Sequence, residues 1–410
     1  MAGSSSDSHG GAAVLDIDPF SLESLKDYHP IDEAVRETDE LVWIERYGFW
    51  ATGRYDVVES VFRDYERFAS TSGTGLTNTK QAGNWRRASV LLENDPPSHT
   101  KYRRIMASIM SPRVVRRLQE GFQQRADEIV DEALARAAGR DGIVDAAKEI
   151  AEAFPLAVLP DAVGFSKQGR EHLLTYSNLN FQSMGPRDSA LYLAAVESSK
   201  EASEFVNWQM RRENLEPGGL GHTIYGYVDE GEIDEEDAGM LVRSFLSAGI
   251  DTTIFGIQFS LIALSRYPEA WRALSADPGL ARAVFEEALR WNPPSPFFGR
   301  TTTRDMEFLG KQLGEGEKVV VFVGAANRDP RHWERPDDFD LGRDAAGHLA
   351  FGTGVHGCVG QMMARMEAAC VLNAVARKVG SIEEAGEPEP FYSSWLRGFE
   401  HLPMRITPKA

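Results

Sequence analysis

The chain has 410 residues, of which 42% are hydrophobic, and its formal net charge is −18. Such a composition supplies enough apolar surface for a large core, and the negative charge argues against nucleic acid or an anionic membrane as a partner. Residues 1–13 are small and polar, so we expect a disordered tail there and a single domain over 14–410. We find no basic leader and no apolar run of membrane-spanning length, and therefore expect a cytoplasmic protein.

The elements expected from the sequence share apolar residues at the spacing of a helix or of a strand. In chain order they are strands over 41–44 and 49–52 with a hairpin turn at 46–48, helices over 57–62, 116–137 and 280–290, and strands over 306–309 and 318–323. We therefore expect a mainly α protein with small β-sheets.

One segment opposes the acidic balance of the chain. Between His99 and Leu118 there are six basic residues and no acid: Lys101, Arg103, Arg104, Arg113, Arg116 and Arg117. On its own, such a segment is read as a solvated helix face with a few structural ion pairs.

The longest expected helix follows the acidic residues 234–237, which suit a helix N-terminus, and stops before Pro268. About 30 residues at roughly 1.5 Å each would extend about 45 Å across the molecule. Gly249, Asp251 and Thr252 lie at its middle, although they are poor helix formers. A central helix that departs from local preference at its midpoint is a candidate site.

Near the C-terminal end, residues 351–360 read FGTGVHGCVG and precede a helical run. The pattern contains G-x-G-x-x-G, but no acidic strand end follows at the spacing that a dinucleotide site requires, so we disfavour that interpretation. Cys358 is expected at the mouth of a helix, where the dipole and free N–H groups stabilise a thiolate. Cys370, about 18 Å further along at roughly 1.5 Å per residue, is too distant for a disulfide and reads as an inert apolar side chain.

This loop resembles F-x-x-G-x-x-x-C-x-G, the haem signature of the cytochrome P450 family. Glu287 and Arg290 resemble the E-x-x-R motif of the family, and Arg343 would be the second arginine of the same buried structural cluster. Residues 248–253 resemble the oxygen-activation segment. The resemblance covers about residues 18–407 and implies the P450 fold, a triangular α-rich prism with haem between the long central helix and the cysteine-ligand helix.

The resemblance also implies how haem b would be held. Cys358 would be the axial ligand of the iron, and the other residues would contact the macrocycle or pair with its propionates: His99, Arg103, Arg300, His356, Phe351, Gly352, Gly360 and Ala248. Two carboxylates at a buried edge require charge-assisted donors, which suits this choice of residue types.

The same resemblance implies catalytic roles for two residues of the central helix. Thr252 would bond to the distal oxygen and Asp251 would relay protons from solvent, whereas alone they would read as a helix-bonded hydroxyl and a paired acid. The chain has no flavin or iron–sulfur motif, so electrons would come from NAD(P)H through a reductase and a [2Fe–2S] ferredoxin, with O2 as co-substrate. The basic segment then becomes the expected docking face for the ferredoxin.

Spacing on the central helix suggests a substrate. Ser244 lies about 12 Å and Ser247 about 7.5 Å from Thr252 at roughly 1.5 Å per residue, which fits an aromatic ring anchored at one end. Residues 85–89 and 243–247 resemble segments of the bacterial P450s that O-demethylate 4-methoxybenzoate. That resemblance implies substrate contacts from Arg86, Ser89, Phe181, Met184, Arg243, Ser244, Ser247 and Phe298.

We therefore expect oxidation of a para-substituted aromatic carboxylate, with 4-methoxybenzoate converted to 4-hydroxybenzoate. Met184 stands where a relative has an aromatic residue, and Arg87-Ala88 replaces Pro-Pro, so the range of para substituents stays open. The alternatives are a P450 that hydroxylates another small hydrophobic substrate, a peroxide-driven haem-thiolate enzyme, or a haem protein that senses ligands without catalysis.

Overall fold

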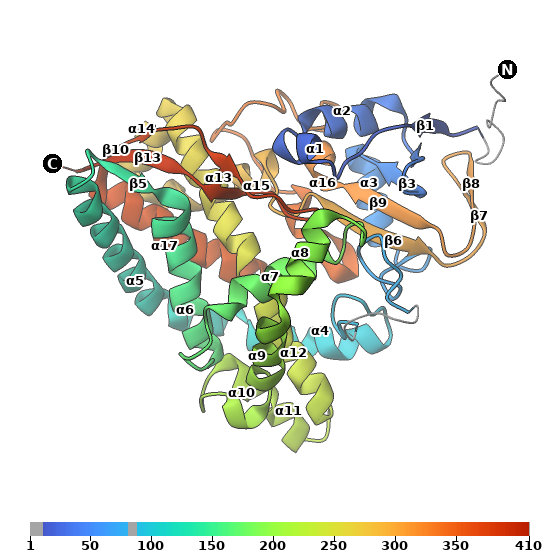
Figure 1. The fold of residues 1–410 in the computed structure, drawn as a ribbon, viewed down its shortest axis with the longest axis horizontal. Coiled ribbons are helices and arrows are strands. Elements are labelled where there is room, and N and C mark those ends of the chain that lie inside the picture. The colour runs from blue at the N-terminus through green and yellow to red at the C-terminus, as the bar shows by residue number, and fades with distance from the viewer. Residues whose placement is uncertain (1–10, 81–87, 410) are drawn as a thin grey trace.

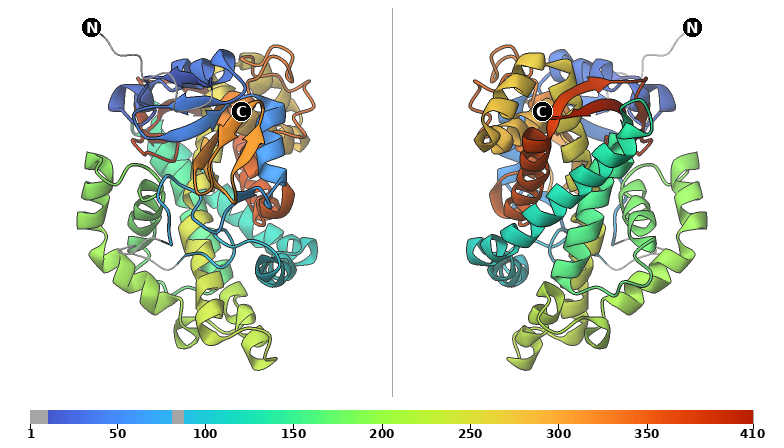
Figure 2. Two further views of the ribbon diagram at one scale, coloured as in Figure 1. Left: turned by 90° about the vertical axis from the view of Figure 1, so that its right-hand side faces the viewer. Right: turned by 90° about the vertical axis from the view of Figure 1, so that its left-hand side faces the viewer.

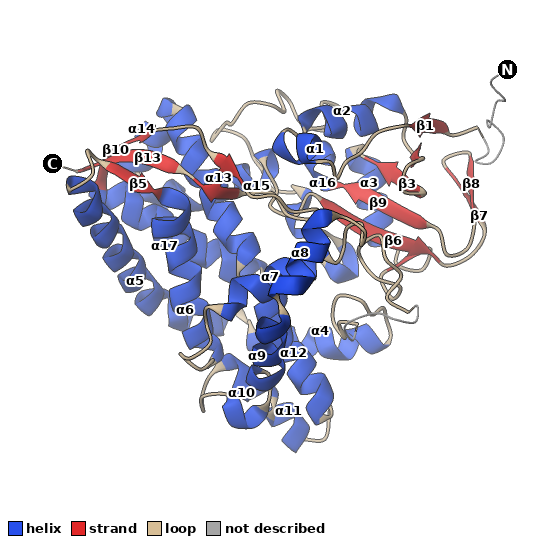
Figure 3. Ribbon diagram, viewed as in Figure 1, coloured by secondary structure: helices blue, strands red, loops and turns tan. Residues whose placement is uncertain are grey.

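The computed structural model describes residues 11–80 and 88–409, and most of them are helical (Figure 3). The strands of the largest sheet gather at one upper corner of the molecule, and helices fill the remainder (Figure 1). The outline is triangular and narrows toward α10 (Leu220–Ile224) and α11 (Gly226–Asp229). The expected mainly α fold with small sheets is confirmed.

Within the described residues, six strands form the largest sheet. Their order is β1 (Ala13–Leu15), β2 (Val42–Ile44), β3 (Phe49–Thr52), β9 (Lys318–Phe322), β6 (Phe297–Thr302) and β4 (Phe68–Ala69). The expected hairpin is confirmed, since β2 and β3 are antiparallel with Trp43 opposite Trp50. Ala13 pairs with Val42 in the parallel β1–β2 ladder, so the expected disordered tail is wrong at residue 13.

The smaller sheets have two or three strands each among the described residues. They are β10 (Val379–Glu384), β13 (Pro403–Pro408) and β5 (Ile143–Asp145) in one sheet, and the pairs β7 (Met306–Phe308) with β8 (Lys311–Leu313) and β11 (Glu389–Pro390) with β12 (Phe399–His401). Both strand-like runs after residue 305 are therefore in sheets, as predicted.

Helices make up the rest of the layers, which Figure 2 shows from two further sides. They are α1 (Leu22–Lys26), α2 (His29–Thr38), α3 (Tyr55–Arg63), α4 (Ser98–Ile109), α5 (Pro112–Ala138), α6 (Ala153–Val163), α7 (His172–Gln182), α8 (Ala190–Ser198), α9 (Lys200–Gln209), α12 (Glu235–Ala248), α13 (Asp251–Arg266), α14 (Pro268–Ala276), α15 (Ala281–Trp291), α16 (Val323–Ala326) and α17 (Gln361–Lys378), with a π-helix η1 (Ala147–Glu152) before α6. The three helices expected around 57–62, 116–137 and 280–290 correspond to α3, α5 and α15.

The long central helix is present, but as two helices, α12 and α13, where one continuous helix was expected; the break falls among the poor helix formers at its middle. The helix α12 begins at the N-cap Asp234, whose carboxylate accepts the backbone N–H of Asp237 at 2.7 Å. The break falls at Gly249 and Ile250. A side chain at residue 249 would place its Cβ 2.8 Å from the carbonyl oxygen of Phe245, so the close approach there requires glycine.

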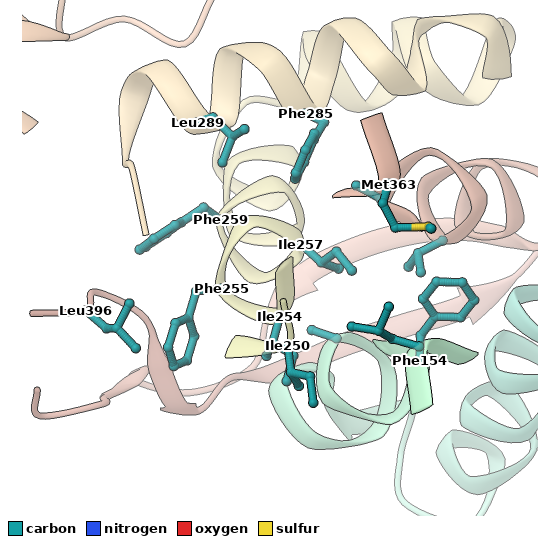
Figure 4. Packing of buried hydrophobic residues seen from close by; sticks show 14 of the residues in the cluster. Phe154, Ile250, Ile254, Phe255, Ile257, Phe259, Phe285, Leu289, Met363 and Leu396 are labelled. Carbon is teal, nitrogen blue, oxygen red and sulfur yellow. The ribbon is translucent and has the colours of Figure 1, made fainter. Parts of the chain in front are cut away.

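The helix α13 lies at the centre of the apolar core. In Figure 4, Phe285 and Leu289 of α15 point toward it from one side, Met363 of α17 from another, and Phe154 of α6 from a third. Burial of a large apolar side chain contributes about 1.5–3 kcal/mol, so this packing fixes the position of the break.

One expectation from hydropathy is wrong. The segment Glu235–Arg266 is long and apolar enough, by length and composition, to cross a membrane. However, 78% of its most apolar window is buried inside the protein, as in the core helix of a folded domain. In the sequence, the polar residues around position 249 interrupt this apolar run.

Candidate active site

A cavity lies between the α12–α13 break and the loop before α17, and it brings together nearly all of the residues that the sequence singled out. Its wall includes Ser89, His99, Arg103, Phe181, Met184, Arg243, Ser244, Ser247, Ala248, Thr252, Phe298, Arg300, Phe351, Gly352, His356, Cys358 and Gly360. Asp251 does not line it, and Arg86 lies outside the described residues. The spread of these residues over α4, α7, α12, β6 and the loop explains why no single motif defines the cavity.

The loop that carries Cys358 is held by a few backbone bonds. Its two short turns are η4 (Leu349–Phe351) and η5 (Gly354–His356), and the Cys358 N–H donates to the Phe351 carbonyl at 2.7 Å. Gly354 has φ +69°, and a Cβ there would lie 2.9 Å from the Phe62 carbonyl oxygen. Glycine is thus required where the loop passes close to α3.

Cys358 precedes α17 by three residues, so the expectation that both cysteines lie on one helix is wrong, although both thiols are free. Burial raises the pKa of the Cys358 thiol, while the N–H groups of Gly360 and Gln361 and the nearby Arg103 oppose that rise. Because burial prevails, the sulfur would be an anion only with a further positive charge, which a metal ion bound in the cavity would supply.

Four basic side chains cluster on one side of the cavity. His99 and Arg103 come from α4, Arg300 from β6, and His356 from the ligand loop, and the His99 and His356 rings lie 4.6 Å apart. Asp95 is the one acid that any of them pairs with among the described residues, through His356 Nε2 at 2.8 Å. Burial lowers the pKa of His99 to about 4 and also lowers that of His356, so the positive charge at this rim comes from Arg103 and Arg300.

The hydrogen-bonding capacity of this basic cluster is only partly used. The buried Arg300 donates through Nη1 to the Gly299 carbonyl at 2.9 Å, and burial lowers its pKa to about 10. His356 Nδ1 is buried and has no partner among the described residues. Buried cations and an unpaired ring nitrogen are costly unless an anion is bound. The cluster thus fits the two carboxylates of a haem, together with a thiol beneath the cavity.

The expected Glu-Arg-Arg cluster is formed. Glu287 and Arg290 are 1% and 0% exposed and make two bonds, at 2.7 and 2.8 Å, and Arg343 Nε reaches Glu287 Oε1 at 3.1 Å. The remaining Arg290 donors bind the carbonyls of Asn327, Pro336 and Asp338. The cluster therefore fastens α15 to the 327–343 segment that leads into the ligand loop.

The two residues at the α12–α13 break face different surroundings. Thr252 lines the cavity and its hydroxyl donates to the Ala248 carbonyl at 2.9 Å. Asp251 is buried on another side, beside Ser177 of α7, and its Oδ1 has no hydrogen-bond partner among the described residues. The pKa of Asp251 is raised to about 7, chiefly by burial and also by the nearby Glu152, while Ser177 and Lys148 oppose the rise. The carboxyl is thus able to exchange a proton near neutral pH.

Several residues near this break were missed from the sequence. Lys148, beside Asp251, bridges Glu152 at 2.9 Å and Glu400 at 2.8 Å near the surface. Glu367 of α17 lines the cavity, and burial raises its pKa to about 8. Neither had a detectable sequence signal, because a lone acid or lysine on a helix usually marks a solvated face.

The polar residues expected to meet a substrate carboxylate are at one part of the cavity wall, but two of them already have backbone partners. Ser244 Oγ donates to the Met240 carbonyl at 3.2 Å, and Ser89 Oγ accepts the N–H of Leu92 at 3.0 Å. Arg243 is 8% exposed in the wall. The serines therefore have part of their hydrogen-bonding capacity left for a ligand.

Comparison with known proteins agrees with this geometry. Residues 279–395 match the family model described as Cytochrome P450. The chain is 46% identical to CYP199A2 of Rhodopseudomonas palustris over 98% of this chain and 96% of that protein. It is 29% identical to cytochrome P450 NovI of Streptomyces niveus over 95% and 98%. The solved structure of CYP108D1 from Novosphingobium aromaticivorans is 28% identical, with a TM-score of 0.80 over 94% of this chain and 96% of that one.

The buried carboxyl at residue 251 predicts a pH-dependent stability. Burial raises its pKa from 3.8 to about 7, so between these values the folded state holds a proton that the unfolded chain releases. The free energy of unfolding therefore falls as pH rises through this window. The stability of Asp251→Asn relative to the parent should rise by on the order of 4 kcal/mol from about pH 4 to pH 7.

Urea unfolding at several pH values measures this difference. The variant Asp127→Asn, an exposed aspartate of α5 paired with Arg377, controls for the loss of a carboxylate. A difference between parent and Asp251→Asn that stays constant across the range would contradict the prediction.

Proposed function

This chain belongs to the cytochrome P450 family and is therefore a haem-thiolate monooxygenase, and we propose that it oxidises a small para-substituted aromatic carboxylate. The observation that carries the proposal is a single cavity whose wall includes the Cys358 thiol, the basic cluster, the α12–α13 break and Arg243. 4-Methoxybenzoate, demethylated to 4-hydroxybenzoate, is the substrate that this arrangement favours.

Haem b would be held by residues from α4, α12, β6 and the ligand loop. Cys358 would bind the iron through its sulfur, and His99, Arg103, Arg300 and His356 would bind the propionates. Phe351, Gly352, Gly360 and Ala248 would contact the macrocycle, since all four line the same cavity. When bound, a thiolate-ligated haem activates O2 and delivers one of its oxygen atoms to a substrate C–H bond.

The ligand assignment predicts opposite results for the two cysteines. Reduced protein with CO should show the red-shifted Soret band of thiolate ligation, and Cys358→Ser should lose it because a serine hydroxyl is a poor donor to iron. Cys370→Ser should keep the band, because Cys370 is buried in α17 with its sulfur 3.8 Å from the Met366 sulfur. Retention of the band in Cys358→Ser would overturn the assignment.

The residues at the break would handle protons. The Thr252 hydroxyl lies at the cavity and directs its proton at the Ala248 carbonyl, so its oxygen is left to accept a hydrogen bond from a bound group. Asp251, with its pKa raised to about 7, would take protons from the side of Lys148 and Glu152 and pass them to the break. The apolar wall meanwhile restricts water.

The substrate carboxylate would bind at the Arg243 end of the cavity. Arg243 would supply the charge, and Ser247, Ser89 and Arg86 would supply further donors. Ser244 would join them by turning its hydroxyl away from the Met240 carbonyl. Phe181, Met184 and Phe298 would line the ring, since all three border the cavity. The axial distance from Ser244 to Thr252, about 12 Å at roughly 1.5 Å per residue, leaves the para group near the break.

Substrate-induced spin-state titration with a panel of para-substituted benzoates tests this orientation. 4-Methoxybenzoate should bind at least about 100-fold more tightly than uncharged 4-methoxytoluene, because only the benzoate has a carboxylate that can pair with the Arg243 guanidinium. Arg243→Leu should remove most of that preference.

Arg266→Leu is the matched control, since Arg266 lies on α13 but is exposed and paired with Glu384. Equal affinity of the parent for both ligands would remove the carboxylate proposal while leaving the monooxygenase assignment intact. Tight binding of a larger apolar ligand instead would favour a different P450 substrate.

Electrons would come from NAD(P)H through a reductase and a [2Fe–2S] ferredoxin that docks on the start of α5. Of the six basic residues expected there, Arg103 lines the cavity and Arg104 is paired with Glu232. Arg113, Arg116 and Arg117 are exposed, and no ion pair involves them among the described residues. The docking face is thus narrower than the whole basic segment.

Charge reversal measures this docking. The double variant Arg113→Glu/Arg116→Glu should slow haem reduction by the ferredoxin at least about tenfold at low salt and flatten its salt dependence. Arg125→Glu is the control. Arg125 lies on the same helix but is paired with Glu128 and Glu132, so its reversal should have little effect on the rate of haem reduction. An unchanged rate and salt dependence in the double variant would exclude this face.

A further inference from the structure

Glu286 stands directly before the Glu287 of the buried cluster, yet it belongs to a different network. Its Oε2 lies 3.0 Å from His348 Nε2 and 3.0 Å from Arg365 Nη2, and Arg365 Nε donates to its Oε1. The His348 side chain is 2% exposed, and those of Glu286 and Arg365 are 15% and 19% exposed. Three elements far apart in the sequence therefore meet at one carboxylate.

The first branch of this network reaches the beginning of the ligand loop. His348 Nδ1 accepts the N–H of Ala350 at 3.2 Å, which caps the turn η4. The ring nitrogen facing Glu286 therefore carries the proton, because Nδ1 acts as an acceptor. Glu286 thus fixes the orientation of the His348 ring and, through it, the backbone of the turn.

The second branch reaches the other end of the loop. Arg365 Nη1 donates to Gln361 Oε1 at 2.7 Å, and Gln361 Nε2 donates to the Cys358 carbonyl at 3.1 Å. The Arg365 guanidinium also lies 4.3 Å from the centre of the Phe351 ring. The Phe351 carbonyl in turn accepts the Cys358 N–H. Both branches of the network therefore lead to Cys358.

We propose that Glu286 is a positioning residue for the thiolate of Cys358, because through His348 and Arg365 it holds both ends of the ligand loop. The inference rests on the proposed ligation of haem iron by Cys358. Glycines at 352, 354, 357 and 360 leave the loop little internal restraint, so its shape depends on contacts from outside.

The same network sets the charge beside the sulfur. Arg365 is one of the cations that lower the pKa of Cys358, against the larger effect of burial. Burial alone would raise the pKa of Glu286, but bonds from His348 and Arg365 outweigh it and hold that pKa at about 2. Glu286 is therefore an anion that partly offsets Arg365, so the two residues have opposite electrostatic effects on the site.

The opposite electrostatic effects of Glu286 and Arg365 predict shifts of opposite sign in the reduction potential of the haem. General damage to the fold would not produce that pattern. One-electron reduction adds negative charge to the haem and its ligand, so Arg365→Gln should lower the reduction potential and Glu286→Gln should raise it. At a partly buried site each change should alter the equilibrium constant for reduction roughly fivefold. Spectroelectrochemical titration of the haem-loaded protein measures both shifts.

The positional effect is measured separately from the charge. Arg365→Lys keeps the charge but loses the planar fork that reaches Glu286 and Gln361 together. It should leave the reduction potential near that of the parent, while amide hydrogen exchange of residues 349–361 rises about tenfold. Arg377→Gln, on the same helix and paired with the distant Asp127, is the matched control and should change neither quantity.

The outcomes separate the two levels of the proposal. A parent protein without the thiolate band would refute ligation by Cys358, on which the inference rests. With that band present, shifts of the same sign in Glu286→Gln and Arg365→Gln, or unchanged loop exchange in Arg365→Lys, would overturn the role of Glu286. If Glu286→Gln does not fold, the comparison of Arg365→Gln with Arg365→Lys decides, since only the first should move the potential.

Discussion

A sulfur anion held away from water is the constraint on which the rest of this structure depends. Burial raises the pKa of the Cys358 thiol, so the anion exists only where dipoles and cations outweigh the lost hydration. The N–H groups of Gly360 and Gln361 and the guanidinium groups of Arg103 and Arg365 favour the anion, and a bound haem iron would add to them. The glycine-rich loop and the start of α17 place these groups around the sulfur.

The broken central helix answers a second requirement, which is to place polar groups inside an apolar core. An unbroken helix would bond every carbonyl at the midpoint and present only a uniform face. The break at Gly249 instead lets Thr252 line the cavity while Asp251 faces Ser177 and the Lys148 side. Packing of α13 against α15 and α17 supplies the stability that the poor local helix propensity removes.

Much of the site could be predicted from sequence, because its motifs are local and each has a specific chemistry. Cys358, the Glu287–Arg290 pair and the helix break are of this kind. Glu286 is different, since it meets residues 62 and 79 positions away and, from the sequence, resembles a surface charge on a helix. The backbone bonds of Ser89 and Ser244 and the strand at Ala13 were likewise invisible, because each depends on pairing partners that only the fold brings close.

The basic segment shows how one stretch of an acidic chain meets two needs. His99 and Arg103 are four residues apart, so they share one face of α4 and line the cavity, whereas Arg104 turns outward to Glu232. Arg113 and Arg116, three residues apart on α5, are exposed. Helical periodicity thus divides the cations between an inner set that lines the cavity and an outer exposed set, which is the proposed docking face. Nearby charges govern the interactions of both sets of basic residues, so the net charge of −18 for the whole chain does not prevent either set from binding an anionic group.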